Sequence, residues 1–111
     1  MKEGYAFLAF TDRGEHLAGK LAAALGGEVS RAVRDISLES WTGTAFKQNE
    51  ALIFVGAAGI AVRALAPWIR HKTEDPAVVV VDETGQFAIS LLSGHLGGAN
   101  ALAAEIAAIT G

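Results

Sequence analysis

The residues best suited to chemistry lie together near the end of the chain, in Ser90 to Asn100, which reads SLLSGHLGGAN. His95 carries the side chain that exchanges a proton most readily near neutral pH. The glycines around it allow backbone conformations barred to other residues and let a ligand approach the main chain. The segment leads from an expected strand into an expected helix, whose free N–H groups attract anions. We therefore predict a site here.

A second glycine-containing turn, Gly56-Ala57-Ala58-Gly59, follows the apolar stretch Ala51 to Val55. Two explanations of this turn are about equally good: the glycines bind a ligand, or they only let a helix and a strand pack closely. Ligand binding is not favoured, because the dinucleotide fingerprint GxGxxG is absent. The phosphate-binding motif GK[ST] is absent too. If the strands before the two turns run parallel and close together, both turns face one crevice beyond the carboxyl ends of the strands.

Charged residues offer weaker signals. Arg63 interrupts the apolar helical stretch IAVRALA, and we expect it either to pair with a carboxylate such as Asp82 or to face a ligand. The basic cluster Arg70-His71-Lys72 is typical of a solvated helix end. His16 and His71 are interpreted as surface residues, and the spacing of the histidines gives no metal-site signature.

Apolar patterns predict the elements that position these residues. Strands are expected at residues 5–10, 29–33, 51–55, 78–81 and 86–91, and helices at residues 12–25, 60–66 and 96–109. Asp12 and Glu15 predict a capping box at the start of the first helix. Arginines 31 and 34 suggest that the second strand is an exposed edge. Residues 35–48 allow a short helix, but Thr42-Gly43-Thr44 disfavours a long one.

This order of elements predicts the α/β class, as an open, mostly parallel sheet with helices on both faces, of the Rossmann or flavodoxin-like type. The turn at residues 82–85 makes the strands at 78–81 and 86–91 an antiparallel pair. Leu102 and Ile106 lie four residues apart in an alanine-rich helix, so we expect both to be buried against the sheet.

Composition narrows the class of protein. The 111 residues suffice for one domain, and the net charge of −3 gives no reason to expect a nucleic-acid partner. The chain has no cysteine, which excludes disulfides and thiolate metal sites and suits a reducing compartment. The N-terminus lacks the pattern of a signal peptide, and no stretch predicts a membrane span. The expected compartment is the cytoplasm.

Three stretches together resemble the N-terminal domain of CbiG, from the cobalamin-biosynthesis enzymes known as cobalt-precorrin-5A hydrolases. They are FVGAAGIAVRALAP at residues 54–67, DPAVVVVDETGQFAISLLSGHLGGAN at residues 75–100, and the opening Thr11-x-x-Gly14. The resemblance covers nearly the whole chain and is densest over residues 51–104. Family members usually continue into a second, C-terminal domain. We therefore expect residues 1–111 to form a single CbiG N-terminal-like domain, with the family's middle and C-terminal domains absent.

The resemblance implies hydrolytic opening of the ring-A δ-lactone of a cobalt-bound tetrapyrrole, followed by loss of acetaldehyde. Such a reaction needs a base for water and donors for the oxyanion. The resemblance gives His95 the role of base, with Asp82 or Glu83 as the next candidates. Binding of the substrate, including its carboxylates and the oxyanion, is expected at Gly56, Gly59, Arg63, Ser93, Gly94, Gly97, Gly98 and Asn100, with help from Arg70 or Lys72.

No cofactor or protein-bound metal is expected, because the cobalt belongs to the substrate. The implied partners are the tetrapyrrole itself and either the CbiG C-terminal domain or other enzymes of the pathway; a homodimer is left open. Two other functions stay open from the sequence. One is a non-catalytic module that binds the tetrapyrrole. The other is an α/β domain that binds a nucleotide or a phosphometabolite through its glycine turns.

Overall fold

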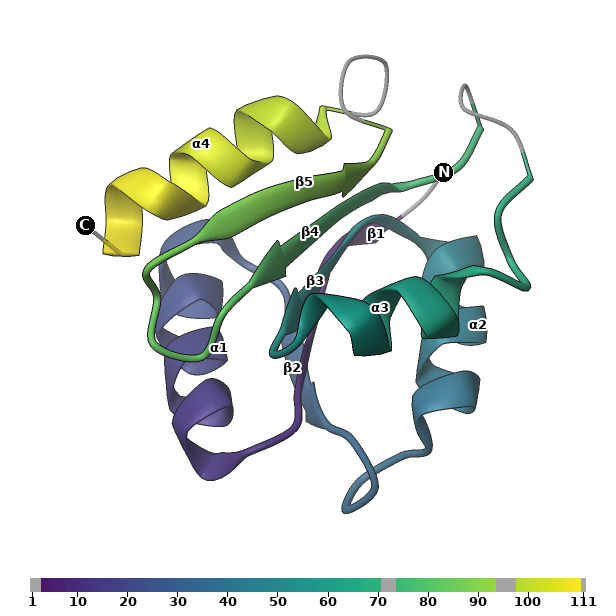
Figure 1. Cartoon of the computed structure of the whole chain (residues 1–111), viewed down its shortest axis with the longest axis horizontal. Coiled ribbons are helices and arrows are strands. Elements are labelled where there is room, and N and C mark those ends of the chain that lie inside the picture. The colour runs from purple at the N-terminus through teal and green to yellow at the C-terminus, as the bar shows by residue number, and fades with distance from the viewer. Residues whose placement is uncertain (1–2, 71–73, 94–97, 111) are drawn as a thin grey trace.

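A five-stranded sheet with the strand order β2-β1-β3-β4-β5 lies between two pairs of helices (Figure 1). The computed structural model describes residues 3–70, 74–93 and 98–110. The elements are β1 (Glu3–Ala9), α1 (Asp12–Leu25), β2 (Glu28–Arg31), α2 (Leu38–Gln48), β3 (Asn49–Val55), α3 (Ala58–Leu65), β4 (Ala77–Val81), β5 (Ala88–Leu92) and α4 (Ala99–Thr110). Within these ranges, no helix combines the length and the hydropathy that crossing a lipid bilayer requires.

The sheet confirms the predicted fold class. Strands β1 to β4 run parallel, and β5 pairs antiparallel with β4 through the pairs Val81–Ala88 and Val78–Leu92. Strand β4, between β3 and β5, is buried along its whole length, as expected for an apolar strand with both faces covered. Strand β5 begins at Ala88, two residues later than predicted, because hydrogen bonds between Asp82 and Phe87 hold the connection as a longer turn.

Each face of the sheet has its own hydrophobic core. Helices α1 and α4 cover one face, where Leu21 and Ile106 are fully buried, and helices α2 and α3 cover the other (Figure 1). The predicted burial of Leu102 and Ile106 is confirmed, with exposures of 6% and 0%. Helix α4 is therefore anchored to the sheet by large side chains spaced one turn apart.

Helix α2 runs through Thr42-Gly43-Thr44, so the prediction that this tripeptide prevents a long helix is wrong. The reason is tertiary. A Cβ atom on Gly43 would lie 2.5 Å from the Trp68 ring, which packs against the helix at this point. Buried Thr42 donates its hydroxyl hydrogen to the Leu38 carbonyl, 2.7 Å away, within the helix. Packing thus outweighs the low helix propensity of the glycine.

The start of α1 also differs from the prediction. The N-cap is Thr11, whose Oγ1 accepts a hydrogen bond from the Gly14 N–H at 3.0 Å, and Asp12 is the first helical residue. The Glu15 carboxylate turns away from the cap and pairs with Arg31 and Arg34. The edge position of β2 is confirmed by the strand order.

Candidate functional site

The two glycine-containing turns emerge from opposite edges of the sheet. Gly56 follows β3, which ends level with Val81 of β4, whereas Ser93 follows β5, which ends level with Val78. These positions on β4 are about 10 Å apart at the usual rise of a strand, and the strands that precede the two turns run in opposite directions. The condition for one shared crevice, two parallel strands before the turns, is therefore not met, because β5 runs antiparallel. We call the side of the sheet where the parallel strands end the carboxyl edge, and the side where they begin the amino edge. Both are distinct from the edge strands β2 and β5.

At the amino edge, a set of hydrogen bonds holds both ends of the predicted site segment. The Ala99 N–H donates to the Ser93 carbonyl at 3.1 Å, and the Ser93 hydroxyl donates to the Asp75 carbonyl at 3.1 Å. Ser93 and Gly98 have φ angles of +58° and +83°, in the left-handed region that glycine adopts freely. The chain that leaves β5 thus returns to begin α4 beside the point where it left.

The sequence-predicted residues of this segment fall into two groups. Ser93 and Gly98 are half-buried at the amino edge, and Asn100 is exposed in the first turn of α4. Gly94, His95 and Gly97 lie outside the described residues. Their predicted roles in catalysis and binding stay predictions.

Asp75 connects this edge to the chain that follows α3. Its side chain is buried, with 7% of the residue exposed, and its Oδ2 accepts a hydrogen bond from the Arg70 N–H at 2.9 Å. Asp75 therefore holds Arg70 and Ser93 at one place, a connection that sequence reasoning missed. The available signal was the Asp-Pro pair directly before an apolar strand. Lys72 and His71 lie outside the described residues.

Two hollows also open at the amino edge and adjoin at Tyr5 and Glu50. The larger, of about 600 Å³, lies between the starts of β1, β2 and β3 and helix α2. The smaller, of about 240 Å³, borders Gly98, Leu102 and Glu105. Burial, Glu50 and Glu105 together raise the pKa of Tyr5, so this phenol remains neutral around pH 7. With Glu28 also at the rim of the larger hollow, acidic side chains line both hollows.

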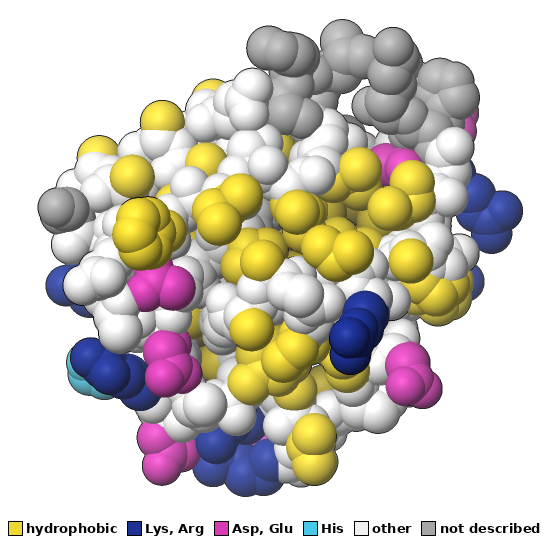
Figure 2. All heavy atoms as spheres, in the orientation of Figure 1, with side chains coloured by type: hydrophobic (Ala, Val, Ile, Leu, Met, Phe, Trp, Pro, Cys, Tyr) yellow, Lys and Arg dark blue, Asp and Glu magenta, His cyan; other side chains and the backbone are white. Residues whose placement is uncertain are grey.

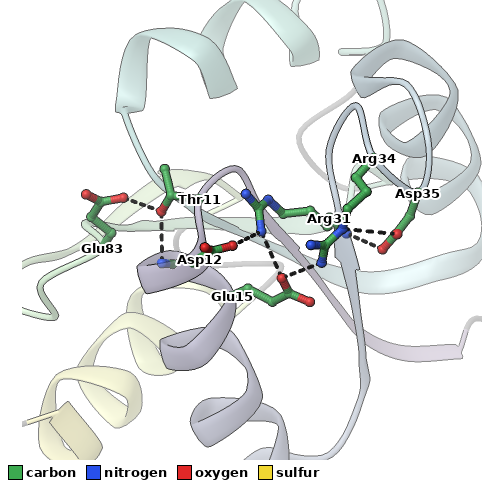
Figure 3. Close-up of polar contacts among 8 residues, drawn as sticks. Thr11, Asp12, Glu15, Arg31, Arg34, Asp35 and Glu83 are labelled. Atoms are coloured by element: carbon green, nitrogen blue, oxygen red, sulfur yellow. Dashed lines mark hydrogen bonds and ion pairs between the residues drawn. The ribbon is translucent and has the colours of Figure 1, made fainter.

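At the carboxyl edge, polar side chains are bonded to one another (Figure 3). The Thr11 hydroxyl donates to the Glu83 carboxylate at 2.5 Å. Three ion pairs join β2 or the following turn to the start of α1: Arg31–Asp12 at 2.8 Å, Arg31–Glu15 at 2.9 Å and Arg34–Glu15 at 2.7 Å. The hydrogen bond from Arg31 lowers the pKa of Asp12. These groups join α1, β2 and the β4–β5 connection.

Asp82 and Glu83, the alternative candidates for a base, are both engaged at this edge. Asp82 accepts hydrogen bonds from the Thr84 hydroxyl and from the Phe87 N–H, the latter at 2.6 Å. Partial burial by itself would raise the pKa of Asp82. The hydrogen bonds from Thr84 and Phe87 outweigh it, so the pKa of Asp82 is lowered. A carboxylate of lowered pKa that already accepts several hydrogen bonds is a weak base.

Arg63 does not pair with Asp82, so that alternative for its partner is wrong. Arg63 lies exposed on α3, whose residues Ala61, Ala64 and Leu65 face the sheet. Among the described residues, Arg63 forms no ion pair. The alternative that it faces a ligand stays a prediction.

The glycines of the first turn differ from each other. The Gly56 N–H donates to the Val81 carbonyl at 2.8 Å, and a Cβ atom on Gly56 would lie 2.8 Å from the Phe10 ring. Close packing thus accounts for Gly56. Around Gly59 a Cβ atom would meet nothing within 4 Å, and the N-terminus of α3 has no side-chain cap. Only Gly59 leaves room for the predicted ligand contact.

The motif Thr11-x-x-Gly14 has a structural explanation. Thr11 caps α1 by accepting the Gly14 N–H. A Cβ atom on Gly14 would lie 3.3 Å from the Val55 carbonyl oxygen, so the glycine lets α1 approach β3 closely. Both residues therefore position helix α1 against the sheet.

Neither edge has the constellation of a metal centre in the described part of the chain, where no three histidine, aspartate or glutamate side chains are grouped to hold an ion. Near the start of α4, the amino edge offers main-chain groups, the hydroxyl of Ser93 and the amide of Asn100. These groups donate and accept hydrogen bonds, and they suit a polar, oxygen-rich ligand.

Comparisons with known proteins agree on one family. The family model described as "Cobalamin synthesis G N-terminal" matches residues 40–111. A cobalt-precorrin-5A hydrolase from Salmonella typhimurium is 47% identical over 118 residues, covering 98% of this chain and 34% of that protein. One from Priestia megaterium is 49% identical over 63 residues, covering 57% of this chain and 17% of that protein.

A solved structure shares the fold. The crystal structure of a cobalamin biosynthesis protein G homolog from Sulfolobus solfataricus superposes with a TM-score of 0.79 and 30% sequence identity, covering 96% of this chain and 34% of that one. The chain thus spans about a third of the length of the Salmonella and Sulfolobus relatives. The matched residues include both glycine turns and the whole of β3 to α4. The chain belongs to the cobalamin synthesis G N-terminal family.

Proposed function

We propose that this chain is the N-terminal part of a hydrolase that acts on cobalt-precorrin-5A in cobalamin biosynthesis. The observation that carries the proposal is the 47% identity to a cobalt-precorrin-5A hydrolase across 98% of the chain. The reaction is opening of the ring-A δ-lactone by water, followed by release of acetaldehyde. The cobalt is part of the substrate, no further cofactor is required, and the cytoplasm is the compartment.

In this proposal the chemistry takes place at the amino edge. His95 removes a proton from water as the oxygen attacks the lactone carbonyl, and the N–H groups of Gly97 and Gly98 stabilise the oxyanion. The ring C–O bond then breaks, and the proton passes to the leaving oxygen to give an acid and an alcohol. Two hydrogen bonds support this assignment, one from the Ala99 N–H to the Ser93 carbonyl and one from the Ser93 hydroxyl to the Asp75 carbonyl. They hold both ends of the segment that carries His95.

The substrate carboxylates are held by groups around this segment. Ser93, Gly94 and Asn100 contact the substrate near the lactone, and Arg70, held through Asp75, supplies a positive charge at the same edge. Gly59 follows β3 at the opposite, carboxyl edge, so its predicted substrate contact, like that of Arg63 on α3, is a separate prediction. Gly56 acts through packing, because its N–H is engaged with Val81.

The experiment is an acetaldehyde assay with cobalt-precorrin-5A as substrate. One sample contains this chain alone. The other adds the separately produced remainder of the Salmonella relative, the part that this chain does not match. Acetaldehyde in either sample, abolished by His95→Gln in this chain, supports the proposal. Acetaldehyde that persists undiminished with His95→Gln overturns the role of His95.

A second candidate function, a non-catalytic module that binds the tetrapyrrole, is favoured by the chain's spanning only 34% of that relative. Titration of the chain with cobalt-precorrin-5A, followed by the absorbance of the macrocycle, separates the two. Binding without acetaldehyde in either sample identifies the module. Absence of both binding and acetaldehyde overturns both functions.

A further inference from the structure

Strand β5 exposes a row of large apolar side chains on one side. Ile89 pairs with Val80, which lies in the core between the sheet and helices α2 and α3, so Ile89 points to that face of the sheet. Leu91, at an irregularity in the pairing of β5 with β4, packs on the same core, and Phe87 directly precedes the strand. Phe87 is 65% exposed and Ile89 is 47% exposed, whereas Leu91 is partly buried against the core between the sheet and helices α2 and α3. The outer part of this row lies in solvent.

Helix α3 continues the exposed surface. Val62 and Ile69 are seven residues apart, and the Ile69 N–H donates to the Leu65 carbonyl at 3.2 Å, so the helical spacing extends past the end of α3. Val62 is 50% exposed and Ile69 is 49% exposed, on the same side of the helix as Leu65. Leu65 and Leu91 belong to the same core cluster, so the exposed side chains of α3 and of β5 lie over the same face of the sheet.

Hydrophobic side chains accordingly gather where β5 and β4 lie next to α3 (Figure 2). We call the set Phe87, Ile89, Leu91, Val62 and Ile69 the β5–α3 face. On the other side of the sheet, α4 packs directly on β5. On the side of the β5–α3 face, the neighbouring helix α3 packs on β4, and Ile89 stays half exposed.

The two edge strands of the sheet differ in their protection. Strand β2 has the sequence EVSR, and its Arg31 is held in ion pairs. Strand β5 has the sequence AISLL, without a charge or a proline. An edge strand without such devices invites pairing or coverage by another segment, and a contiguous apolar surface marks an interaction site.

We propose that the β5–α3 face is the docking surface for the polypeptide that follows this domain in its longer relatives, which presents an apolar surface to it. This chain matches 34% of the Salmonella and Sulfolobus relatives, and the matched family is an N-terminal one, so about two thirds of such a chain lies beyond it. Within a single polypeptide that remainder is present at a high effective concentration. The remainder can therefore cover the face at any protein concentration. A second copy of the chain covers it only when the protein concentration exceeds the dissociation constant of the dimer.

The test uses this chain and the separately produced remainder of the Salmonella relative, with binding measured by calorimetry. The relative's own N-terminal third serves as the positive control. We expect the chain to bind the remainder and Ile89→Asp to weaken binding by about tenfold or more, because it buries an unpaired charge in the interface. The matched control is Val33→Asp, the same kind of change at a residue that is 90% exposed outside the face; it should leave binding unchanged.

Several outcomes overturn the proposal. One is that neither this chain nor the relative's own N-terminal third binds the remainder, or that only the relative's third does. Another is that Ile89→Asp binds the remainder as well as the wild-type chain does. A third is that Val33→Asp weakens binding as much as Ile89→Asp does. Sedimentation of the chain alone tests the other occupant: a dimer that Ile89→Asp dissociates and that the remainder does not displace assigns the face to a second copy. Circular dichroism melts of each variant verify that the fold is retained, and Val62→Asp repeats the test from α3.

Discussion

The carboxyl and amino edges of this sheet differ in how their polar groups are used. At the carboxyl edge, Thr11, Glu83 and Arg31 are bonded to side chains of neighbouring elements. At the amino edge, Asp75 and Ser93 use hydrogen bonds to position two connecting segments. At the carboxyl edge the polar groups are used for stability. At the amino edge they position the two ends of a connecting segment next to the N-terminus of α4.

This difference depends on the direction of one strand. In open parallel sheets, ligands usually bind beyond the carboxyl ends of the strands. Here β5 runs antiparallel to β4, so the turn between β5 and α4 emerges at the amino edge. A strand-to-helix turn rich in glycine keeps its local chemistry wherever it lies, but the direction of the strand decides which groups surround it.

The largest expected effect compares a base at each edge. In an enzyme assembled from this domain and the remainder of its relative, His95→Gln should slow acetaldehyde release by about 10²–10⁴-fold, the usual contribution of general acid–base catalysis. Glu83→Gln should change the rate by less than about threefold, because Glu83 is engaged with Thr11. The reverse result would move the chemistry to the carboxyl edge.

Removal of the anchor of α4 should destabilise the fold. Ile106 is fully buried, so Ile106→Ala should lower the free energy of unfolding by about 2–5 kcal/mol. Ile89→Ala, at a residue that is 47% exposed, serves as the control, with an expected loss below about 1 kcal/mol. Urea denaturation measures both. Equal losses would show that the β5–α3 face is part of the core in solution.

The glycines of the first turn offer a matched pair. Gly56→Ala places a Cβ atom 2.8 Å from the Phe10 ring and should destabilise by about 1–3 kcal/mol. Gly59→Ala meets open space within a helix and should be neutral or stabilising by up to about 1 kcal/mol. Thermal melts compare them. A neutral Gly56→Ala would remove the packing explanation and return Gly56 to the candidates for ligand binding.

The smallest effect concerns pH at the carboxyl edge. Hydrogen bonds lower the pKa of Asp82 below its ordinary value of 3.8. Its carboxylate therefore stabilises the folded state above that pH, and the stabilisation is lost as the pH falls through the lower, folded-state pKa. Denaturation at pH 7 and at pH 3 should show a smaller acid-induced loss for Asp82→Asn than for wild type. An unchanged loss would mean that Asp82 does not contribute.

The sequence by itself determined the fold class and most elements. The apolar runs Ala51 to Val55 and Val78 to Val81 predicted buried strands, and a turn between Val81 and the next strand predicted the antiparallel pair, all confirmed. These features succeed because hydrophobic period and turn chemistry are local properties of the chain. The family resemblance is likewise carried by short local stretches of sequence.

Tertiary structure decided where each group lies and what it contacts. Gly43 fits within α2 because Trp68 packs on it, and Asp75 brings Arg70 to Ser93. The antiparallel direction of β5 places the segment after β5 at the amino edge. The two glycine-containing turns therefore do not meet in one crevice, although their sequences are similar. Such contacts join residues that are distant in sequence, and no local pattern encodes them. The packed sheet alone fixes which polar groups become partners.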